Sequence, residues 1–509
     1  MQENTDKSII INSLTLYARL AIVSVSGLLY TRFSLQALGM SDYGLYSVIA
    51  SIIVFAGIAN TIMVTTSNRF MAIAEGRGDR EEARRQFNVN LAVHAMIAVG
   101  TVTFALPLGH AYIDGHVNYA GSMDVVTRVY DIAVLSSAVS FLGVPYNGLL
   151  IARERFFVFC GTDVLMSLFK LLFSWLLITH FDHKLLVYTY VMAFMTAFPA
   201  FVYMVYCRLK FPDTVRLMLV CGKRRYIEVF NFSIGIGIGA VATIGKAQGG
   251  ALIINMFFNT VVNAGLAVAS SVSLLLQTFA NNVQKPITPQ IVKSYASGDM
   301  RRCMTLVCFA SKATCLTMFF VSIPFLLIPE TLLGLWLDQT PPDAVTFMRL
   351  IIIDTLIFTA NAGVNDYVFA TGRIKTYQLI ISTLLVASVA VGWLALRGGM
   401  PAQTLFYVYI VFSLIVFVVR PFIIRHVTGF DVLTLARRSY LPILLVLTLF
   451  LPYALLCRPS SDIVYVTLAY AYYLPLIYFL GLDSSERAAL NGAVRAAAAR
   501  VGARFGRRA

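Results

Sequence analysis

Hydrophobic residues along this chain of 509 residues gather into long apolar stretches, which short polar connections separate. A helix needs roughly twenty apolar residues to cross a membrane, whereas a strand of a membrane barrel needs only about ten. Fourteen stretches approach or exceed the helical length. They lie at 9–34, 43–65, 88–110, 126–151, 157–180, 184–207, 229–256, 259–283, 303–328, 346–370, 377–396, 403–419, 440–457 and 463–482. The pattern predicts an all-α polytopic membrane protein with about 14 transmembrane helices.

The Lys and Arg residues indicate how these helices are oriented. If the N-terminus lies inside, thirty of the 40 basic residues fall in inside segments and seven within or at the edge of apolar stretches. Only Lys184, Arg397 and Arg458 fall outside. Short cytoplasmic loops carry an excess of Lys and Arg in membrane proteins. The asymmetry predicts that both termini are cytoplasmic and that residues 111–122 and 329–345 lie outside.

Composition narrows the class of partners. Hydrophobic residues make up 58% of the chain and charged residues 13%, whereas a soluble domain carries roughly a quarter charged residues. The net charge of +15 is explained by inside loops that face anionic membrane lipids, so no nucleic-acid partner is expected. The seven cysteines form no C-x-x-C pair and the histidines no H-E-x-x-H motif, so neither a metal site nor a cofactor is expected. The outside connections are too short for a catalytic domain, which argues against an enzyme.

The chain contains an internal repeat. When the sequence is shifted by 220 residues, Gly78-Asp79 falls on Gly298-Asp299, and the first twelve stretches superimpose as six on six. Repeats of six helices keep the same orientation, so we expect a parallel duplication about an axis along the membrane normal. The predicted parts are an N-terminal six-helix lobe at 1–208, a cytoplasmic linker at 209–228, a second six-helix lobe at 229–425, an appended helix pair at 426–482 and a basic tail at 483–509.

Three stretches resemble motifs of one family of membrane proteins. They are Tyr30–Arg32 with Leu38–Tyr46, Thr66–Phe70 with Gly78–Asp79, and Pro289–Ile291 with Ser294–Asp299. In these motifs the sequence is similar to bacterial polysaccharide flippases, the Wzx-type branch of the multidrug/oligosaccharidyl-lipid/polysaccharide exporter superfamily. We interpret Gly39 and Gly44 as the residues that let the chain reverse, and Asp42 as a cap of the second helix.

The resemblance implies two lobes around a central cavity, in the bacterial inner membrane. Such proteins flip a polyprenyl-diphosphate-linked oligosaccharide from the cytoplasmic to the periplasmic leaflet, for O-antigen of lipopolysaccharide, capsule or exopolysaccharide. A polysaccharide polymerase or export machinery is then an expected partner. In relatives with two extra helices, that pair is thought to form a groove for the lipid tail. The alternatives are a cation-coupled multidrug exporter of the same superfamily and a membrane glycan polymerase or ligase.

Seven cations lie within or at the edge of the apolar stretches: Arg19, Arg32, Arg128, Lys170, Lys246, Lys312 and Arg349. An unpaired cation at a helix centre costs about 3 kcal/mol. Arg32, Arg128 and Arg349 lie near the predicted outer ends and can reach water by snorkelling. Arg32 could equally line a portal or gate. No carboxylate lies within two turns of Arg19, Lys246 or Lys312 on the same stretch, so we expect these three to hold the diphosphate.

For Lys170 two interpretations stay open. Asp163 lies seven residues earlier on the same helical face and could be its structural partner, or Lys170 could contact the substrate. Asp131, Asp163 and Asp354 are candidates for ion coupling, because a buried carboxylate can take up a proton on one side and release it on the other. Asp131 could instead pair with Arg128. Arg349 lies five residues from Asp354, so a pair between those two is less assured.

The glycines near Lys246 resemble a phosphate-binding loop but do not match it. The stretch from Gly239 to Gly245 has one residue too many between its glycines, and Ala247 occupies the position of the metal-binding Ser or Thr. We interpret Gly235, Gly237 and Gly239 as residues that allow close helix packing or a bend.

Overall fold

The computed structural model describes residues 2–76, 79–153, 155–220, 222–372, 374–457, 461–488 and 491. Within these ranges the side chains of 2–21, 24, 65, 69, 72–73, 75–76, 156, 232, 235–236 and 374–375 are not described. The described part of the chain consists of helices and connections, and it contains no strand. This confirms the predicted all-α membrane fold.

Each of the fourteen expected stretches falls on helix, although the described residues give a lower count of membrane-spanning helices. Twelve helices are long and apolar enough to cross a membrane, or thirteen if a bent pair counts as one span. The stretches expected at 9–34 and 43–65 both fall in α1 (Gln2–Ala56), which continues through a break at Gly39. The expected stretch at 346–370 is the bent pair, in which α14 (Ala344–Thr359) and α15 (Ala362–Thr371) meet at 44°.

The chain divides into two compact units. Unit 1 comprises Met1–Ser271, Leu333–Met348 and Gln378–Tyr409, and unit 2 comprises Val272–Leu332, Arg349–Tyr377 and Ile410–Ala509. These units do not follow the boundaries of the two predicted lobes, which stay a prediction.

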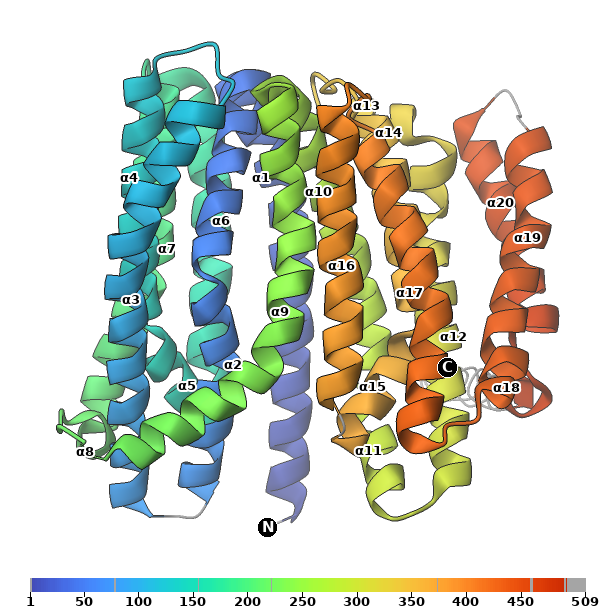
Figure 1. Cartoon of the computed structure of the whole chain (residues 1–509), viewed down its shortest axis with the longest axis horizontal. Coiled ribbons are helices and arrows are strands. Elements are labelled where there is room, and N and C mark those ends of the chain that lie inside the picture. The colour runs from blue at the N-terminus through green and yellow to red at the C-terminus, as the bar shows by residue number, and fades with distance from the viewer. Residues whose placement is uncertain are drawn as a thin grey trace, which may run out of the picture. The chain divides into compact units, whose positions relative to one another are not determined.

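Unit 1 is a bundle of long helices (Figure 1). Within it α1 packs against α6 and α9, α3 against α4, and α4 against α7. Its helices are α1, α2 (Ile58–Gly76), α3 (Arg80–His116), α4 (Met123–Phe141), α5 (Val144–Ala152), α6 (Phe156–His180), α7 (Lys184–Lys210), α8 (Pro212–Val215) and α9 (Lys223–Phe257), with the first part of α10 (Thr260–Gln284), most of α16 (Ile374–Arg397) and the start of α17 (Thr404–Thr428).

Unit 2 is built around α12, which packs against α15, α19 and α20. Figure 1 shows α19 and α20 as a helical hairpin near the end of the chain, at the place of the predicted appended pair. The helices of the unit are the end of α10, α11 (Thr288–Ala296), α12 (Met300–Leu327), most of α14, α15, the end of α17, α18 (Val432–Leu435), the π-helical turn η1 (Ala436–Tyr440), α19 (Leu441–Leu456), α20 (Asp462–Leu476) and η2 (Ile477–Gly481). The short helix α13 (Pro329–Trp336) is divided between the units.

The repeated Gly-Asp turns begin corresponding helices. The Asp79 carboxylate accepts hydrogen bonds from the backbone of Glu81 and Glu82 at the start of α3, and Asp299 accepts one from Arg302 at the start of α12. A carboxylate at this position satisfies backbone N–H groups that have no partner within the helix. Two residues related by the 220-residue shift therefore make the same local structure.

Gly44 and Asp42 act differently from the sequence interpretation, whereas Gly39 acts as expected. Gly39 has φ of 76° and breaks α1 as expected, but Gly44 lies within the helix and permits close packing. A Cβ atom at Gly44 would lie 1.7 Å from the carbonyl oxygen of Thr260, so α1 and α10 touch through their backbones. Asp42 does not act as a helix cap among the described contacts; it accepts a hydrogen bond from the Tyr119 hydroxyl at 2.7 Å.

Candidate functional site

Lys312, expected to be a substrate-binding cation, has a carboxylate partner inside unit 2. Its Nζ atom lies 2.5 Å from Oε2 of Glu486, and the two side chains are only 3% and 14% exposed. Glu486 also accepts the backbone N–H of Asp483 at 2.8 Å, which fixes its orientation. The pair neutralises a cation that the sequence left without a local partner. The expectation that Lys312 lacks a carboxylate partner is therefore wrong, and its contact with a diphosphate stays a prediction.

Lys170 lies against an aromatic cluster in unit 1. Its Nζ atom stands 3.6 Å from the centre of the Tyr30 ring, and Tyr30 in turn contacts Tyr188 through a hydrogen bond between their hydroxyls. Tyr46 packs edge-on against Tyr188. Cation–π contact stabilises a partly desolvated ammonium. The structure thus gives Lys170 an aromatic partner, and Asp163 lies half-buried two turns earlier on α6.

The two remaining candidate diphosphate ligands are described to different degrees. Lys246 is half-buried on α9, with its Nζ atom 5.0 Å from the centre of the Tyr409 ring. The side chain of Arg19 lies outside the described part of the chain, although its backbone belongs to α1. The proposed contacts of both residues with a diphosphate stay predictions.

Arg32 forms an ion pair that connects two distant parts of unit 1. Its Nη2 atom lies 2.8 Å from Oδ1 of Asp338, and both side chains are about one-third exposed, at 36% and 38%. Nearby, Nε1 of Trp336 donates a hydrogen bond of 2.8 Å to the carbonyl oxygen of Leu28. Residues 336–338 therefore hold the end of the first apolar stretch of α1. A portal or gating role for Arg32 stays a prediction.

The candidate carboxylates for ion coupling have partners other than the expected arginines. Asp131 accepts a hydrogen bond from His110 at 2.7 Å, and it makes no described contact with Arg128. Asp354 accepts one from the Ser413 hydroxyl at 2.5 Å.

The second expected arginine pair is also replaced by another contact. Nη2 of Arg349 lies 3.5 Å from Oε1 of Glu330. Among the described residues, no three His, Cys, Asp or Glu side chains gather as a metal site would require.

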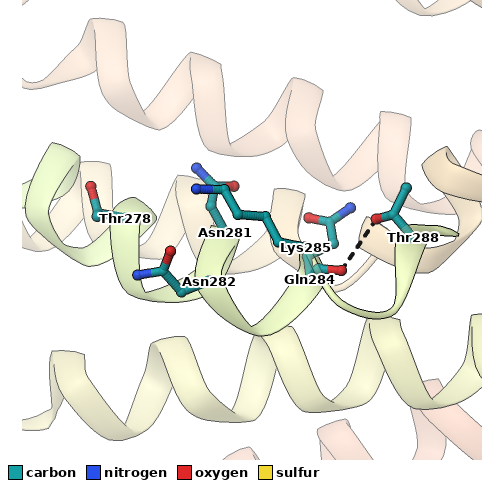
Figure 2. Close-up of a pocket in the computed structure, with 6 residues that line it drawn as sticks. All are labelled: Thr278, Asn281, Asn282, Gln284, Lys285 and Thr288. Atoms are coloured by element: carbon teal, nitrogen blue, oxygen red, sulfur yellow. Dashed lines mark hydrogen bonds between the residues drawn. The ribbon is translucent and has the colours of Figure 1, made fainter. Parts of the chain in front are cut away.

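A polar pocket of about 300 Å³ lies along the end of α10 in unit 2, and the sequence analysis did not identify it. Figure 2 shows its six lining residues, which come from α10, the turn after it and the first residue of α11: Thr278, Asn281, Asn282, Gln284, Lys285 and Thr288. Asp366 on α15 supports the turn, because it accepts hydrogen bonds from Gln284 at 3.0 Å and Thr288 at 2.7 Å.

The chemistry of this pocket suits a glycosylated phosphate. Asn and Gln amides both donate and accept hydrogen bonds, as sugar hydroxyls require, and the Lys285 ammonium can neutralise a phosphate. The signal for it was present in the sequence. Thr278 and Asn281 lie three residues apart on α10, and Lys285 and Thr288 continue the spacing of three and four residues through the turn to the start of α11.

A second, apolar groove of about 1010 Å³ lies wholly within unit 2. Its walls come from α12, α14 and α17 on one side and from α19 and α20 on the other, with residues such as Phe319, Ile353, Leu414 and Leu447. Polar side chains are few and lie mainly at one end, where Glu330, Arg349 and Asp462 line it. The groove therefore suits a long apolar chain.

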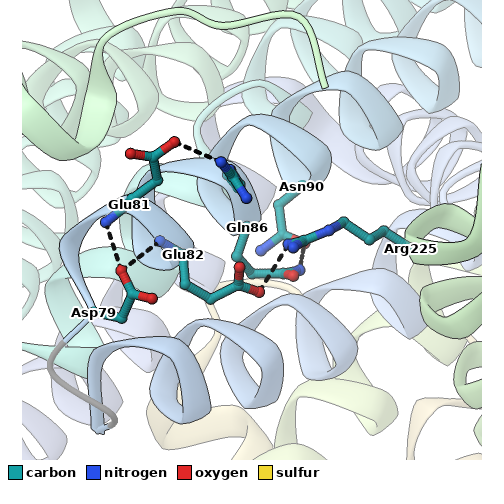
Figure 3. Close-up of polar contacts among 7 residues, drawn as sticks. Asp79, Glu81, Glu82, Gln86, Asn90 and Arg225 are labelled. Atoms are coloured by element: carbon teal, nitrogen blue, oxygen red, sulfur yellow. Dashed lines mark hydrogen bonds and ion pairs between the residues drawn. The ribbon is translucent and has the colours of Figure 1, made fainter. Parts of the chain in front are cut away.

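The start of α9 is held against α3 by charged side chains (Figure 3). Nη1 of Arg225 lies 2.7 Å from Oε1 of Glu82, and this hydrogen bond raises the pKa of Arg225 above its ordinary value. The predicted linker at 209–228 is therefore ordered at its end, since Lys223 already begins α9.

The glycine interpretation is confirmed at Gly239, where a Cβ atom would lie 1.7 Å from the Gln378 side chain.

Comparisons with known proteins agree on the fold. The sequence matches no protein-family model and no curated protein. The lipid II flippase MurJ in an inward closed conformation is similar in structure, with a TM-score of 0.68 and 11% identity over 92% of this chain and 99% of that one. An inward-facing multidrug resistance MATE family transporter of the MOP superfamily gives a TM-score of 0.65 and 13% identity, over 81% of this chain and 99% of that one.

A third solved structure extends the comparison. The MATE multidrug transporter DinF-BH gives a TM-score of 0.58 and 16% identity, over 84% of this chain and 97% of that one. At these identities the similarities establish that this chain has the fold of these membrane proteins.

Proposed function

We propose that this protein is a flippase that moves a polyprenyl-diphosphate-linked oligosaccharide from the cytoplasmic to the periplasmic leaflet of the bacterial inner membrane. The observation that carries the proposal is the apolar groove of unit 2, between α12, α14 and α17 and the hairpin of α19 and α20. A polyprenyl chain is long and apolar, so it can pack against the apolar side chains that line such a groove. The fold shared with a lipid II flippase is consistent with such a substrate.

The head of the substrate would meet the polar pocket of α10. Lys285 supplies positive charge for the diphosphate, and Asn281, Asn282 and Gln284 supply amides for sugar hydroxyls. Arg19 and Lys246 are further proposed contacts of the diphosphate. Alternating access would then expose the head first to one side of the membrane and later to the other, for the assembly of O-antigen, capsule or exopolysaccharide.

A chromosomal deletion tests the proposal directly. The deletion strain should accumulate one lipid-linked oligosaccharide on the cytoplasmic face of the membrane and lose the corresponding surface polysaccharide. Complementation with the wild-type chain should restore export. Absence of any accumulated lipid-linked glycan, with surface polysaccharide intact, would contradict the proposal.

A matched pair of variants then tests the groove. Leu447 lines the groove, whereas Leu445 on the same helix does not and is 39% exposed. Leu447→Trp should reduce export because it fills the groove, and Leu445→Trp should leave export near the wild-type level at equal protein abundance.

A multidrug exporter is the second candidate, because exporters share the fold. The same deletion strain distinguishes the two. Increased sensitivity to cationic dyes together with normal surface polysaccharide would favour drug export.

A further inference from the structure

Arg420 is a buried cation whose charge the described residues do not neutralise. It lies on α17 in unit 2 with 2% of its surface exposed. Its Nε and Nη1 atoms have no hydrogen-bond partner, and no ion pair of Arg420 occurs among the described residues. The guanidinium instead stands over two aromatic rings, with Cζ 5.0 Å from the centre of Phe358 and 5.7 Å from that of Tyr377. A buried charge normally requires a paired group or an ionic ligand.

A second source of positive potential lies in the same cluster. Phe358 belongs to the end of α14, and α15 begins after a break at Asn361 with the 44° change in direction. The N-terminus of a helix carries partial positive charge and N–H groups that point at anions. Ser311 accepts one of these N–H groups, that of Gly363, at 3.0 Å. The guanidinium stands over Phe358 in the last turn of α14, whose partial negative charge favours a cation, whereas an anion between the guanidinium and the start of α15 would be favoured by both of these positive groups.

The cluster lies beside the apolar groove and shares residues with its wall. Ala360, Phe417 and Tyr440 line the groove. Phe417 stands three residues before Arg420 on α17, and its ring centre is 4.5 Å from that of Tyr440. The Tyr440 hydroxyl donates a hydrogen bond to Oδ1 of Asn361. Phe417, three residues before Arg420, and Tyr440 thus belong to the wall of the groove next to this cluster.

The backbone at this wall is irregular. Tyr440 ends the π-helical turn η1, and Ser439 beside it is buried with no described partner for its hydroxyl. Single π-helical turns within α-helices occur frequently at functional sites. Polar groups with unused hydrogen-bonding capacity therefore gather at the Tyr440 end of the apolar groove, away from Glu330, Arg349 and Asp462.

We propose that Arg420 binds the phosphate group of a lipid whose apolar chain occupies the groove. The site rests on the proposed function only in treating the groove as a lipid site. Tyr440 turns away from Asn361 to admit the phosphate, and Asn361 then offers its amide to a phosphate oxygen. A polyprenyl phosphate and a phospholipid headgroup share this chemistry, and the binding experiment distinguishes them.

The experiment measures lipid binding to the purified full-length chain in detergent. The probes are geranylgeranyl phosphate, dioleoyl phosphatidate, geranylgeraniol and inorganic phosphate, and the variants are Arg420→Gln and Arg420→Lys. Arg425→Gln is the matched control, because Arg425 is an exposed arginine on the same helix. The wild type and Arg425→Gln should bind geranylgeranyl phosphate at least tenfold more tightly than geranylgeraniol. Arg420→Gln should lose this preference, and Arg420→Lys should keep part of it.

Each outcome decides the proposal. Tighter binding of a phosphate-bearing lipid that depends on Arg420 supports the site. If only geranylgeranyl phosphate binds in this way, the lipid is a polyprenyl phosphate. If dioleoyl phosphatidate binds equally well, a phospholipid headgroup also fits. An unchanged preference in Arg420→Gln would overturn the site and leave Arg420 as a structural cation over aromatic rings.

A second variant covers failure of Arg420→Gln to fold. Tyr440→Phe removes the hydroxyl that competes for Asn361, so it should bind geranylgeranyl phosphate at least as tightly as the wild type. Weaker binding would contradict the proposed path past Tyr440. The export assay in the deletion strain judges the flippase function separately, since binding to purified protein requires no transport.

Discussion

Lys312 and Glu486 form a buried ion pair that connects α12 to the segment after α20, with Nζ and Oε2 2.5 Å apart. The pair joins residues that lie 174 positions apart in the chain. It fixes the end of the α19–α20 hairpin to the helix that forms one wall of the apolar groove. The hairpin is thereby held by a charged contact as well as by apolar packing.

Removal of one partner of this pair should destabilise the protein strongly. Glu486→Gln leaves the Lys312 ammonium buried without a counter-charge, which costs about 3–5 kcal/mol. Thermal unfolding in detergent should show a lower midpoint, and the double variant Lys312→Met with Glu486→Leu should recover most of the loss. Glu330→Gln is the control: Glu330 is 65% exposed and its pair with Arg349 contributes about 0–1 kcal/mol. Equal effects of the two single variants would show that burial of the Lys312 pair is unimportant.

Cross-linking Arg32 to Asp338 should arrest transport. The charged atoms of these residues are 2.8 Å apart, and both side chains are accessible. The long Arg32 side chain spans most of the distance between the two backbones, so the double variant Arg32→Cys with Asp338→Cys is joined by a reducible bis-methanethiosulfonate cross-linker of similar length. We expect the cross-linked protein to lose export of the surface glycan, with recovery after reduction. The two single cysteine variants control for loss of the ion pair, which should alter stability by about 1 kcal/mol or less. Undiminished export by the cross-linked protein would exclude a gating role for this contact.

The polar face of α10 should determine how well the substrate head is held. Lys285→Gln and Asn281→Leu each remove a group that lines the polar pocket, and we expect export to fall about tenfold, equivalent to about 1.4 kcal/mol. Lys293→Gln provides the matched control, since Lys293 is an exposed cation on the neighbouring α11 and does not line the pocket. Export is measured as surface polysaccharide at equal protein abundance. A uniform decrease in all three variants would indicate a general effect of charge.

Gly44→Ala should be among the most destabilising small substitutions in the chain. The added methyl group would lie 1.7 Å from the backbone oxygen of Thr260, so the two helices would have to separate. Overpacking of this kind typically costs about 1–3 kcal/mol and occasionally more. Gly27→Ala is the control, because a Cβ atom there meets nothing within 4 Å. Abundance in the membrane and the midpoint of thermal unfolding report the difference. Normal folding of Gly44→Ala would mean that the close contact of α1 and α10 is dispensable.

The helices could be predicted from the sequence because a lipid environment permits few alternatives. Every backbone polar group in hydrocarbon needs a partner, so long apolar stretches must be helical. The partners of charged residues could not be predicted in the same way. Glu486 and Asp338 lie 174 and 306 residues from their cations, and hydropathy contains no information about pairs of distant residues. For this reason the sequence shows no partner for Lys312 and leaves two interpretations open for Arg32.

The break between α14 and α15 illustrates a different limit. Residues 359–361 contain neither proline nor glycine, the usual signals of a helix end, so the stretch was interpreted as one continuous span. The break arises from contacts with other helices, such as the hydrogen bond between Ser311 and Gly363. By contrast, the polar face of α10 is visible in the sequence once its residues are placed at helical intervals.

The continuous helix α9 lies in the connection between the two predicted lobes and limits how that connection can move. It runs from Lys223 to Phe257, and its apolar spanning part begins only at Gly237. Figure 1 shows that it changes direction along this length. An α-helix resists stretching, so we expect a tilt of the spanning part of α9 to move the part before Gly237 with it. The ion pair of Arg225 with Glu82 connects this part of α9 to α3, so we expect α3 to move with it.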